Sequence, residues 1–189
     1  VSKSDLKQLH RASNRLLREV EMQQFFQASG DTASAMIANM QADRQSINCQ
    51  EILNELSGFF SNHPLARDKT LRTTITESHK SLNTDPVLLV RVLNNMLINA
   101  MEASPPGAEI IIKASPNSER YQFAVWNPGF IPEIVARRIF QRNFSTKASL
   151  GRGLGTFSMK LIGEQILGGT VNFRSTREDG TEFRIRLPY

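Results

Sequence analysis

The stretch RVLNNMLINAMEAS, residues 91–104, decides the fold. Its apolar residues recur every three or four positions, which predicts a helix with one face on a core. Asn95 and Asn99 stand four positions apart, so they share another face of that helix, one turn apart. Asparagine is an indifferent helix former and costs free energy when it is buried without partners. The pair therefore requires an explanation beyond helix formation. The expected core-facing residues are Leu89, Leu93, Met96 and Ala100.

The helix around this stretch has clear boundary signals. Asp85 is a favoured N-cap residue, and Pro86 suits the first helical position. The residues SPPG at 104–107 end the helix, which we expect over 86–103.

The sequence on both sides of this helix predicts one mixed α/β domain over 49–189, preceded by a helical arm. The arm is a helix over 5–28 with a heptad-like seam, which favours a partner helix from outside the chain. Domain boundaries are expected at 1–30 for the arm, 31–48 for a linker and 49–189 for the domain. Helices are expected at 49–60, 133–140 and 156–167, and strands at 70–78, 108–115, 120–127, 170–176 and 181–187.

Composition limits the possible classes of protein. The 189 residues carry a net charge of +5, but their basic residues are scattered, which argues against a nucleic-acid surface. A single cysteine, Cys49, excludes an internal disulfide framework and fits a reducing compartment. No apolar run approaches the ~18 residues of a membrane span. Because the first residue is Val, we expect a cytoplasmic fragment of a longer protein, which a membrane segment could anchor.

Three further motifs follow the asparagine helix. GRGLGT at 151–156 precedes a helix, so its glycines would let backbone N–H groups approach an anion; a flexible turn is the alternative. WNPGFIP at 126–132 ends a strand and could receive a flat ring, or could be a simple turn. IFQRNFSTK at 139–147 combines aromatic residues with Arg142 and Lys147, which suits either phosphate contact or a docked surface loop.

The order of the four motifs resembles the ATP-binding domain of bacterial sensor histidine kinases. NNMLINAMEAS is similar to the N box of that family, NPGFIP to its G1 box, IFQRNFSTK to its F box and GRGLGT to its G2 box. The closing segment DGTEFRIRLP also resembles the family's last strand. The resemblance covers residues 49–189 and implies the Bergerat fold, a two-layer α/β sandwich shared with DNA gyrase and heat-shock chaperones.

The resemblance also implies the cofactors ATP and Mg²⁺ and a set of site residues. Asn99 matches the position that coordinates Mg²⁺, and Asn95 lies beside it where gyrase-like relatives have a glutamate that activates water. An amide cannot accept a proton near neutral pH, so we expect poor hydrolysis and better phosphoryl transfer. No catalytic residue is expected in the chain. The implied nucleotide-binding residues are Asn95, Asn99, Asn127, Gly129, Arg142, Lys147, Gly151, Arg152, Gly153, Leu154, Gly155, Thr156 and Thr181.

Three positions depart from the family pattern. Asn127 stands where the G1 box has an aspartate that accepts a hydrogen bond from the adenine amino group. The box is also one residue short, with Ile131 in place of its second glycine. Glu102 replaces a common lysine or arginine, so Lys147 and Arg152 are expected to supply the cationic contact with phosphate.

The phosphoacceptor histidine of the family has no match in this chain. His10, His63 and His79 all lack its sequence context, and the arm resembles the second helix of the dimerisation hairpin. The expected partners are the acceptor helix of the full-length protein, a response regulator receiver domain and a second copy in a homodimer, with no nucleic acid and no membrane contact by this fragment. The alternatives are a gyrase- or chaperone-like ATPase, a kinase that phosphorylates a partner serine, and a degenerate nucleotide-sensing or partner-binding module.

Overall fold

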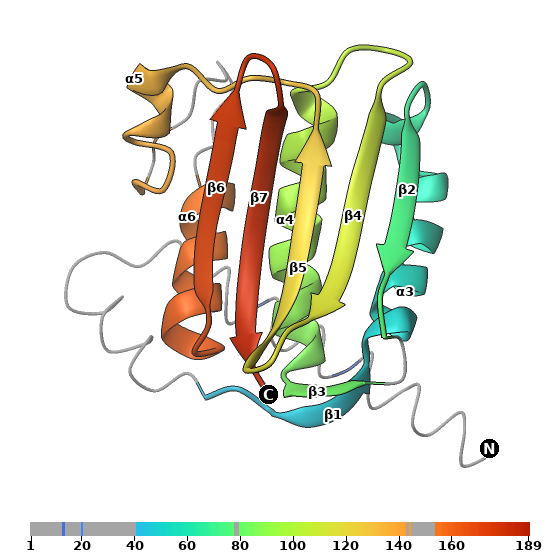
Figure 1. Cartoon of the computed structure of the whole chain (residues 1–189), viewed down its shortest axis with the longest axis vertical. Helices are drawn as coiled ribbons and strands as arrows, with labels where there is room; N and C mark the ends of the chain where they lie inside the picture. Colours follow the sequence, from blue (N-terminus) through green and yellow to red (C-terminus); the bar gives the residue numbers. More distant parts are fainter. Residues whose placement is uncertain (1–12, 14–19, 21–40, 78–79, 143, 145–153) are drawn as a thin grey trace. The chain divides into compact units, whose positions relative to one another are not determined.

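A five-stranded mixed sheet carries helices on one of its faces (Figure 1). The computed structural model describes residues 13, 20, 41–77, 80–142, 144 and 154–189, and the sheet belongs to the unit Ala42–Tyr189. The arm helix expected over 5–28 lies outside the described residues, apart from Ser13 and Val20, which are helical. Within the described ranges, no helix has both the length and the apolar character that a bilayer crossing requires.

The sheet has the strand order β2-β4-β5-β7-β6. Only β2 and β4 are parallel, and the other neighbours are antiparallel. A separate small sheet pairs β1 with β3. The strands are β1 (Gln45–Asn48), β2 (Thr70–Ile75), β3 (Ser81–Thr84), β4 (Glu109–Pro116), β5 (Arg120–Asn127), β6 (Thr170–Thr176) and β7 (Gly180–Pro188).

Three main helices cover one face of the large sheet, so the expected two-layer α/β sandwich is confirmed. The helix α4 packs on β4 and β5, while α3 packs on β2 and α6 on β6. The α-helices are α3 (Cys49–Ser61), α4 (Pro86–Glu102), α5 (Glu133–Ala136) and α6 (Gly155–Lys160), and a π-helical segment, Leu161–Ile166, continues α6.

The boundaries differ from the expected ones in several places. The strand expected at 70–78 ends at Ile75. The helix expected at 133–140 is α-helical only over Glu133–Ala136. The helix expected at 156–167 begins one residue earlier and is π-helical in its second half. The strand β3 was not among the expected elements, because it has only four residues. The strand β1 lies within the segment 31–48, for which the sequence allowed a linker with a short strand.

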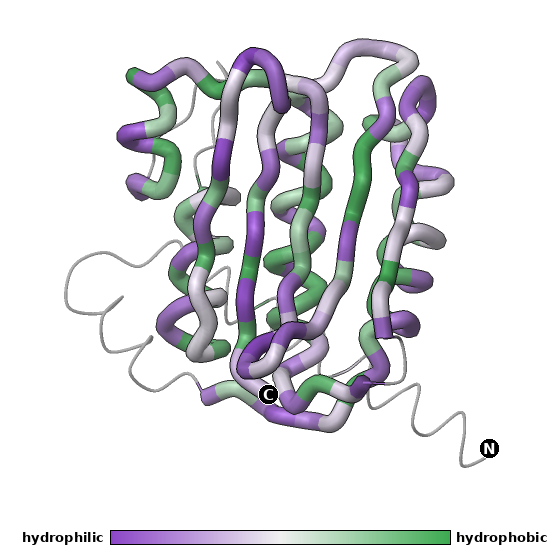
Figure 2. Tube along the Cα trace, in the orientation of Figure 1, coloured by the Kyte–Doolittle hydropathy of each residue, from purple (hydrophilic) through white to green (hydrophobic). Residues whose placement is uncertain are grey.

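The core lies between the sheet and the helices. Figure 2 shows hydrophobic and hydrophilic residues alternating along β7, and a continuous hydrophobic run in β4 at 110–112. The α4 residues expected to face the core are all buried. Cys49 is also fully buried, and desolvation raises the pKa of its thiol to about 11, so it is a packing residue at neutral pH. Other buried core residues are Phe60, Leu82, Tyr121, Phe123, Ile162 and Ile185.

Replacing Asp85 with alanine is expected to lower the free energy of unfolding by about 2 kcal/mol, the upper end of N-cap losses. The Asp85 carboxylate accepts hydrogen bonds from the backbone N–H groups of Val87 (3.0 Å) and Leu88 (3.1 Å). It also accepts from the N–H of Asp43 at 3.0 Å, which ties the segment before β1 to the start of α4. Urea unfolding of wild type, Asp85→Ala and Asp85→Asn measures the loss, and Asn should restore most of it. Equal midpoints for the wild type and the alanine variant would contradict this role.

Candidate functional site

The polar face of α4 is directed towards α6. Asn95 and Asn99 are half-buried, and the Asn95 Nδ2 donates a hydrogen bond to the Ser158 Oγ at 3.1 Å. Because Asn99 lies one turn further on the same side of α4, both amides border the region where α4 and α6 pack together. The asparagine pair therefore belongs to an interhelical site and not to open helix surface.

The start of α6 lies beside Asn95. A Cβ atom added at Gly155 would be 3.9 Å from the Asn95 Oδ1, so Gly155 lies directly beside this amide oxygen. Leu154 precedes α6, and its carbonyl accepts a hydrogen bond from the Ser158 N–H at 2.7 Å. Leu154 and Thr156 flank Gly155 and are half-buried. The structure thus brings this end of the G2-like motif to the asparagine helix.

The end of β5 forms a second group of site residues. Asn127 is 2% exposed and pairs in register with Thr181 of β7, which is also buried. The Thr181 Oγ1 donates a hydrogen bond to the Gly129 carbonyl at 2.7 Å. Asn127, Gly129 and Thr181 therefore lie together, although they are up to 54 positions apart in the sequence.

Two glycines permit close backbone approaches in this group. A Cβ at Gly129 would lie 2.7 Å from both the Ala103 carbonyl oxygen and the Asn127 Nδ2. Gly180 has φ +75°, and a Cβ there would lie 2.3 Å from the Asn127 carbonyl oxygen. Ala103 is the C-cap of α4, so the loop after β5 passes directly against the end of the asparagine helix.

The shortened loop after β5 is held by contacts with the β6–β7 hairpin. The Ile131 N–H donates to the Ser175 Oγ at 2.8 Å, and the same hydroxyl lies 2.8 Å from the Thr181 Oγ1. The Arg177 guanidinium stacks 4.9 Å from the centre of the Phe130 ring. The missing residue therefore gives a short loop with its own hydrogen bonds, and these bonds keep Asn127 and Gly129 in place.

The F-box-like segment is partly described. Phe140 packs against Phe173 and Phe183, with ring centres 5.8 Å and 6.3 Å apart, so it anchors this segment on β6 and β7. Arg142 follows it and is half-buried. Lys147, Gly151, Arg152 and Gly153 lie outside the described residues, and their roles stay predictions.

Sequence reasoning missed two serines that organise the site. Ser158 binds Asn95 from one turn into α6, and Ser175 links the loop after β5 to β6. The pairing of Ser175 with Thr181 in the β6–β7 hairpin could have been inferred from the tight turn between these strands. The Ser158 contact depends on how two helices pack, which no local pattern indicates.

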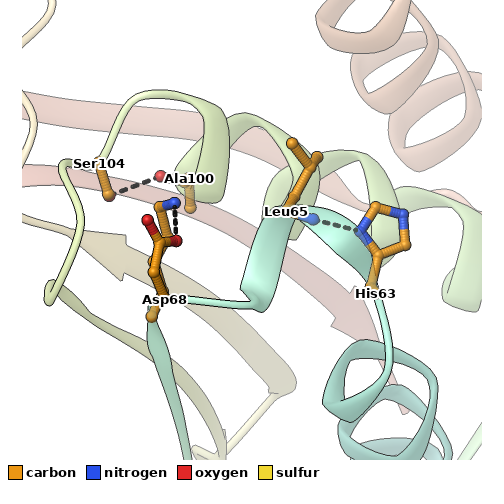
Figure 3. Close-up of polar contacts among 6 residues, drawn as sticks. His63, Leu65, Asp68, Ala100 and Ser104 are labelled. Atoms are coloured by element: carbon orange, nitrogen blue, oxygen red, sulfur yellow. Dashed lines mark hydrogen bonds and ion pairs between the residues drawn. The ribbon is translucent and has the colours of Figure 1, made fainter.

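His63 has a structural role (Figure 3). Its Nδ1 accepts a hydrogen bond from the Leu65 N–H at 3.2 Å and caps a short 3₁₀ helix, Pro64–Ala66. Its ring also packs on Phe59 and Phe60. His10 and His79 lie outside the described residues.

The donor set fits Mg²⁺ only together with a phosphate ligand. In the described part of the chain, no group of three or more His, Cys, Asp or Glu residues is placed to hold a metal. The Asn99 amide oxygen is a neutral hard ligand, and Mg²⁺ commonly keeps water and binds through few protein groups plus substrate phosphates.

Residues 84–189 match the family described as histidine kinase-, DNA gyrase B- and HSP90-like ATPase. The match covers α4, the loop after β5, α6 and the closing hairpin, which are the elements that build the site. The chain belongs to this family, and its site is of the ATP-binding type.

The relatives of this chain narrow the class of ATP-binding domain to which it belongs. The sensor histidine kinase ZraS of Salmonella typhi is 31% identical over 147 residues, or 76% of this chain and 31% of the relative. The sensor histidine kinase CusS of Escherichia coli O157:H7 is 29% identical over 153 residues, covering 77% and 31%. The catalytic domain of histidine kinase ThkA superposes with a TM-score of 0.70 at 26% identity, covering 77% of this chain and 95% of that domain. The domain is therefore a catalytic domain of the sensor histidine kinase type.

The chain spans about a third of the length of the curated relatives it matches, 31% for ZraS and for CusS. The comparisons therefore define the class of the domain over this part of such a protein.

Proposed function

We propose that this domain binds Mg·ATP and transfers the γ-phosphoryl group to a histidine outside residues 1–189, for relay to a response regulator. The observation that carries the proposal is the arrangement along one side of α4. Asn127 and Gly129 lie at its C-terminal end, and Asn95 with Gly155 lies two turns earlier. The eight positions from Ala103 to Asn95 span about 12 Å of helix, a length suited to a nucleotide with its base at one end and its phosphates at the other.

In this arrangement the adenine would lie against Asn127 and Gly129, and the phosphates would lie beside Asn99 and Asn95. Asn99 would hold Mg²⁺ through its amide oxygen, and bound Mg²⁺ would neutralise phosphate charge. Lys147 and Arg152 are proposed as cationic phosphate contacts, with Arg142 as a further one. Phosphoryl transfer depends chiefly on such positioning and charge stabilisation.

Asn95 favours transfer to an acceptor over hydrolysis. Its Nδ2 donates to Ser158, which directs its Oδ1 towards Gly155. An amide oxygen can accept a hydrogen bond from water but cannot remove its proton near neutral pH. The site therefore orients groups without supplying a general base, and we infer that the proton acceptor lies beside the histidine on the other domain.

We also infer the domain organisation that the sequence predicts for the chain. Residues 1–30 would form the second helix of a dimerisation hairpin, 31–48 a linker and 49–189 the catalytic domain. The described unit begins at Ala42. The full-length protein would act as a homodimer with its catalytic domains in the cytoplasm.

The test is a calorimetric titration of the purified chain with ATP and ADP, with and without Mg²⁺, followed by incubation with γ-labelled ATP. We expect ATP binding that Mg²⁺ strengthens, and no stable label on the chain itself. A longer version of the protein that includes the preceding helix should become labelled, and the label should be lost in acid and kept in base, as for phosphohistidine. Steady phosphate release without labelling would indicate an ATPase. Acid-stable label on a serine would indicate a serine kinase, and no nucleotide binding would indicate an interaction module.

A further inference from the structure

Asn127 has a buried donor that the surrounding protein does not use. Its side chain is 2% exposed, and its Nδ2 has no hydrogen-bond partner among the described residues. A buried amide N–H₂ group without a partner is unfavourable, so such an atom requires an explanation, and a ligand that accepts its hydrogen bond is one. Asn127 is the last residue of β5 and lies in the site proposed above for the adenine base.

The neighbouring polar groups are already engaged with one another. The Thr181 Oγ1 donates to the Gly129 carbonyl at 2.7 Å, and the Ser175 Oγ accepts from the Ile131 N–H. The Asn127 Nδ2 lies close against Gly129, where an added Cβ would be 2.7 Å from it. The loop thus surrounds an amide whose donor these neighbouring polar groups do not satisfy.

Resting on the ATP site proposed above, we propose that Asn127 recognises two adjacent atoms of adenine. Its Oδ1 accepts a hydrogen bond from the 6-amino group, and its Nδ2 donates one to ring nitrogen N1. A primary amide presents an acceptor beside a donor, which complements a donor beside an acceptor on the base. N1 and the 6-amino group form the edge farthest from the ribose, so this edge enters a buried site first.

This contact distinguishes asparagine from the aspartate expected at the same position. An ionised carboxylate has only acceptors, so it can bind the 6-amino group but cannot donate to N1. Asn127 would therefore make the affinity of this domain sensitive to an adenine atom that a carboxylate does not read directly. It would act as a specificity-determining residue for the base.

The test compares three nucleotides in the presence of Mg²⁺: ATP, 1-deaza-ATP and 7-deaza-ATP. Each of the two analogues replaces one ring nitrogen near the 6-amino group by C–H. The nitrogen that 1-deaza-ATP lacks is N1, whereas 7-deaza-ATP keeps N1. We expect wild-type protein to bind 1-deaza-ATP about tenfold more weakly than ATP, the effect of losing one buried hydrogen bond. It should bind 7-deaza-ATP within about twofold of ATP. Asn127→Asp should bind ATP and 1-deaza-ATP equally well.

The outcomes separate this inference from the function on which it rests. Failure of ATP itself to bind would overturn the proposed nucleotide site. Tight ATP binding with equal affinity for 1-deaza-ATP would overturn only the N1 contact, as when Nδ2 turns to the nearby Ala103 carbonyl. A loss confined to 7-deaza-ATP would also overturn it, by placing the other edge of the base against Asn127. The wild-type comparison decides the question even if Asn127→Asp does not fold.

Discussion

Asn99→Ala is expected to abolish the strengthening of ATP binding by Mg²⁺, with a loss of affinity of about a hundredfold. Removing a group that only orients a metal ligand already lowers metal affinity by about 10–100-fold, and Asn99 is proposed to bind the ion itself. The substitution removes the amide oxygen and leaves the helix backbone intact, because alanine is the best helix former. Binding without Mg²⁺ should change little, since the base contacts proposed at Asn127, which is buried, would remain.

Asn94→Ala is the matched control for this prediction. Asn94 is also half-buried on α4, but it points about 140° around the helix axis from Asn99. Calorimetric titration with ATP, with and without Mg²⁺, should show wild-type behaviour for Asn94→Ala and a Mg²⁺-independent weak site for Asn99→Ala. If both variants keep the Mg²⁺ effect, the metal is held elsewhere and the assignment of Asn99 is wrong.

The sequence predicted the asparagine helix well because its signals are local. Asp85 caps α4 through hydrogen bonds to residues two and three positions away, and Pro86 occupies the first turn. The same is true of β4 and β5, whose alternation or continuous apolar runs follow from burial by α4. The first and last residues of these elements could therefore be predicted from the local sequence to within one or two positions.

The parts that sequence reasoning missed depend on contacts between distant segments. The π-helical segment after α6 places Gly163 where a Cβ would lie 2.4 Å from the Val171 Cγ2, and such packing has no local signature. The effect of shortening the loop after β5 was also open, because Ser175 and Thr181 come from a hairpin more than 40 residues later. The order of the motifs predicted the family and its ATP-binding class of site, whereas tertiary packing determined how the loops of the site are held.

Gly129→Ala is expected to weaken ATP binding by at least about tenfold and to lower the free energy of unfolding by about 1–3 kcal/mol, as overpacking does. The added Cβ would lie 2.7 Å from the Ala103 carbonyl oxygen, which is backbone and cannot rotate away. It would also lie 2.7 Å from the Asn127 Nδ2, so the loop must shift away from α4 or the Asn127 amide must turn. Either movement disturbs the group proposed to bind adenine.

Gly58→Ala provides the same chemical change at a site that should tolerate it. Gly58 lies inside α3, and a Cβ there would have no atom within 4 Å. Because alanine is a better helix former than glycine, this variant should be more stable by about 0.5–1 kcal/mol and should bind ATP normally. Urea unfolding and ATP titration of both variants separate the two effects. If Gly129→Ala bound ATP as tightly as Gly58→Ala, the close approach of this loop to α4 would have no part in nucleotide binding, and the adenine site would have to be placed away from Asn127.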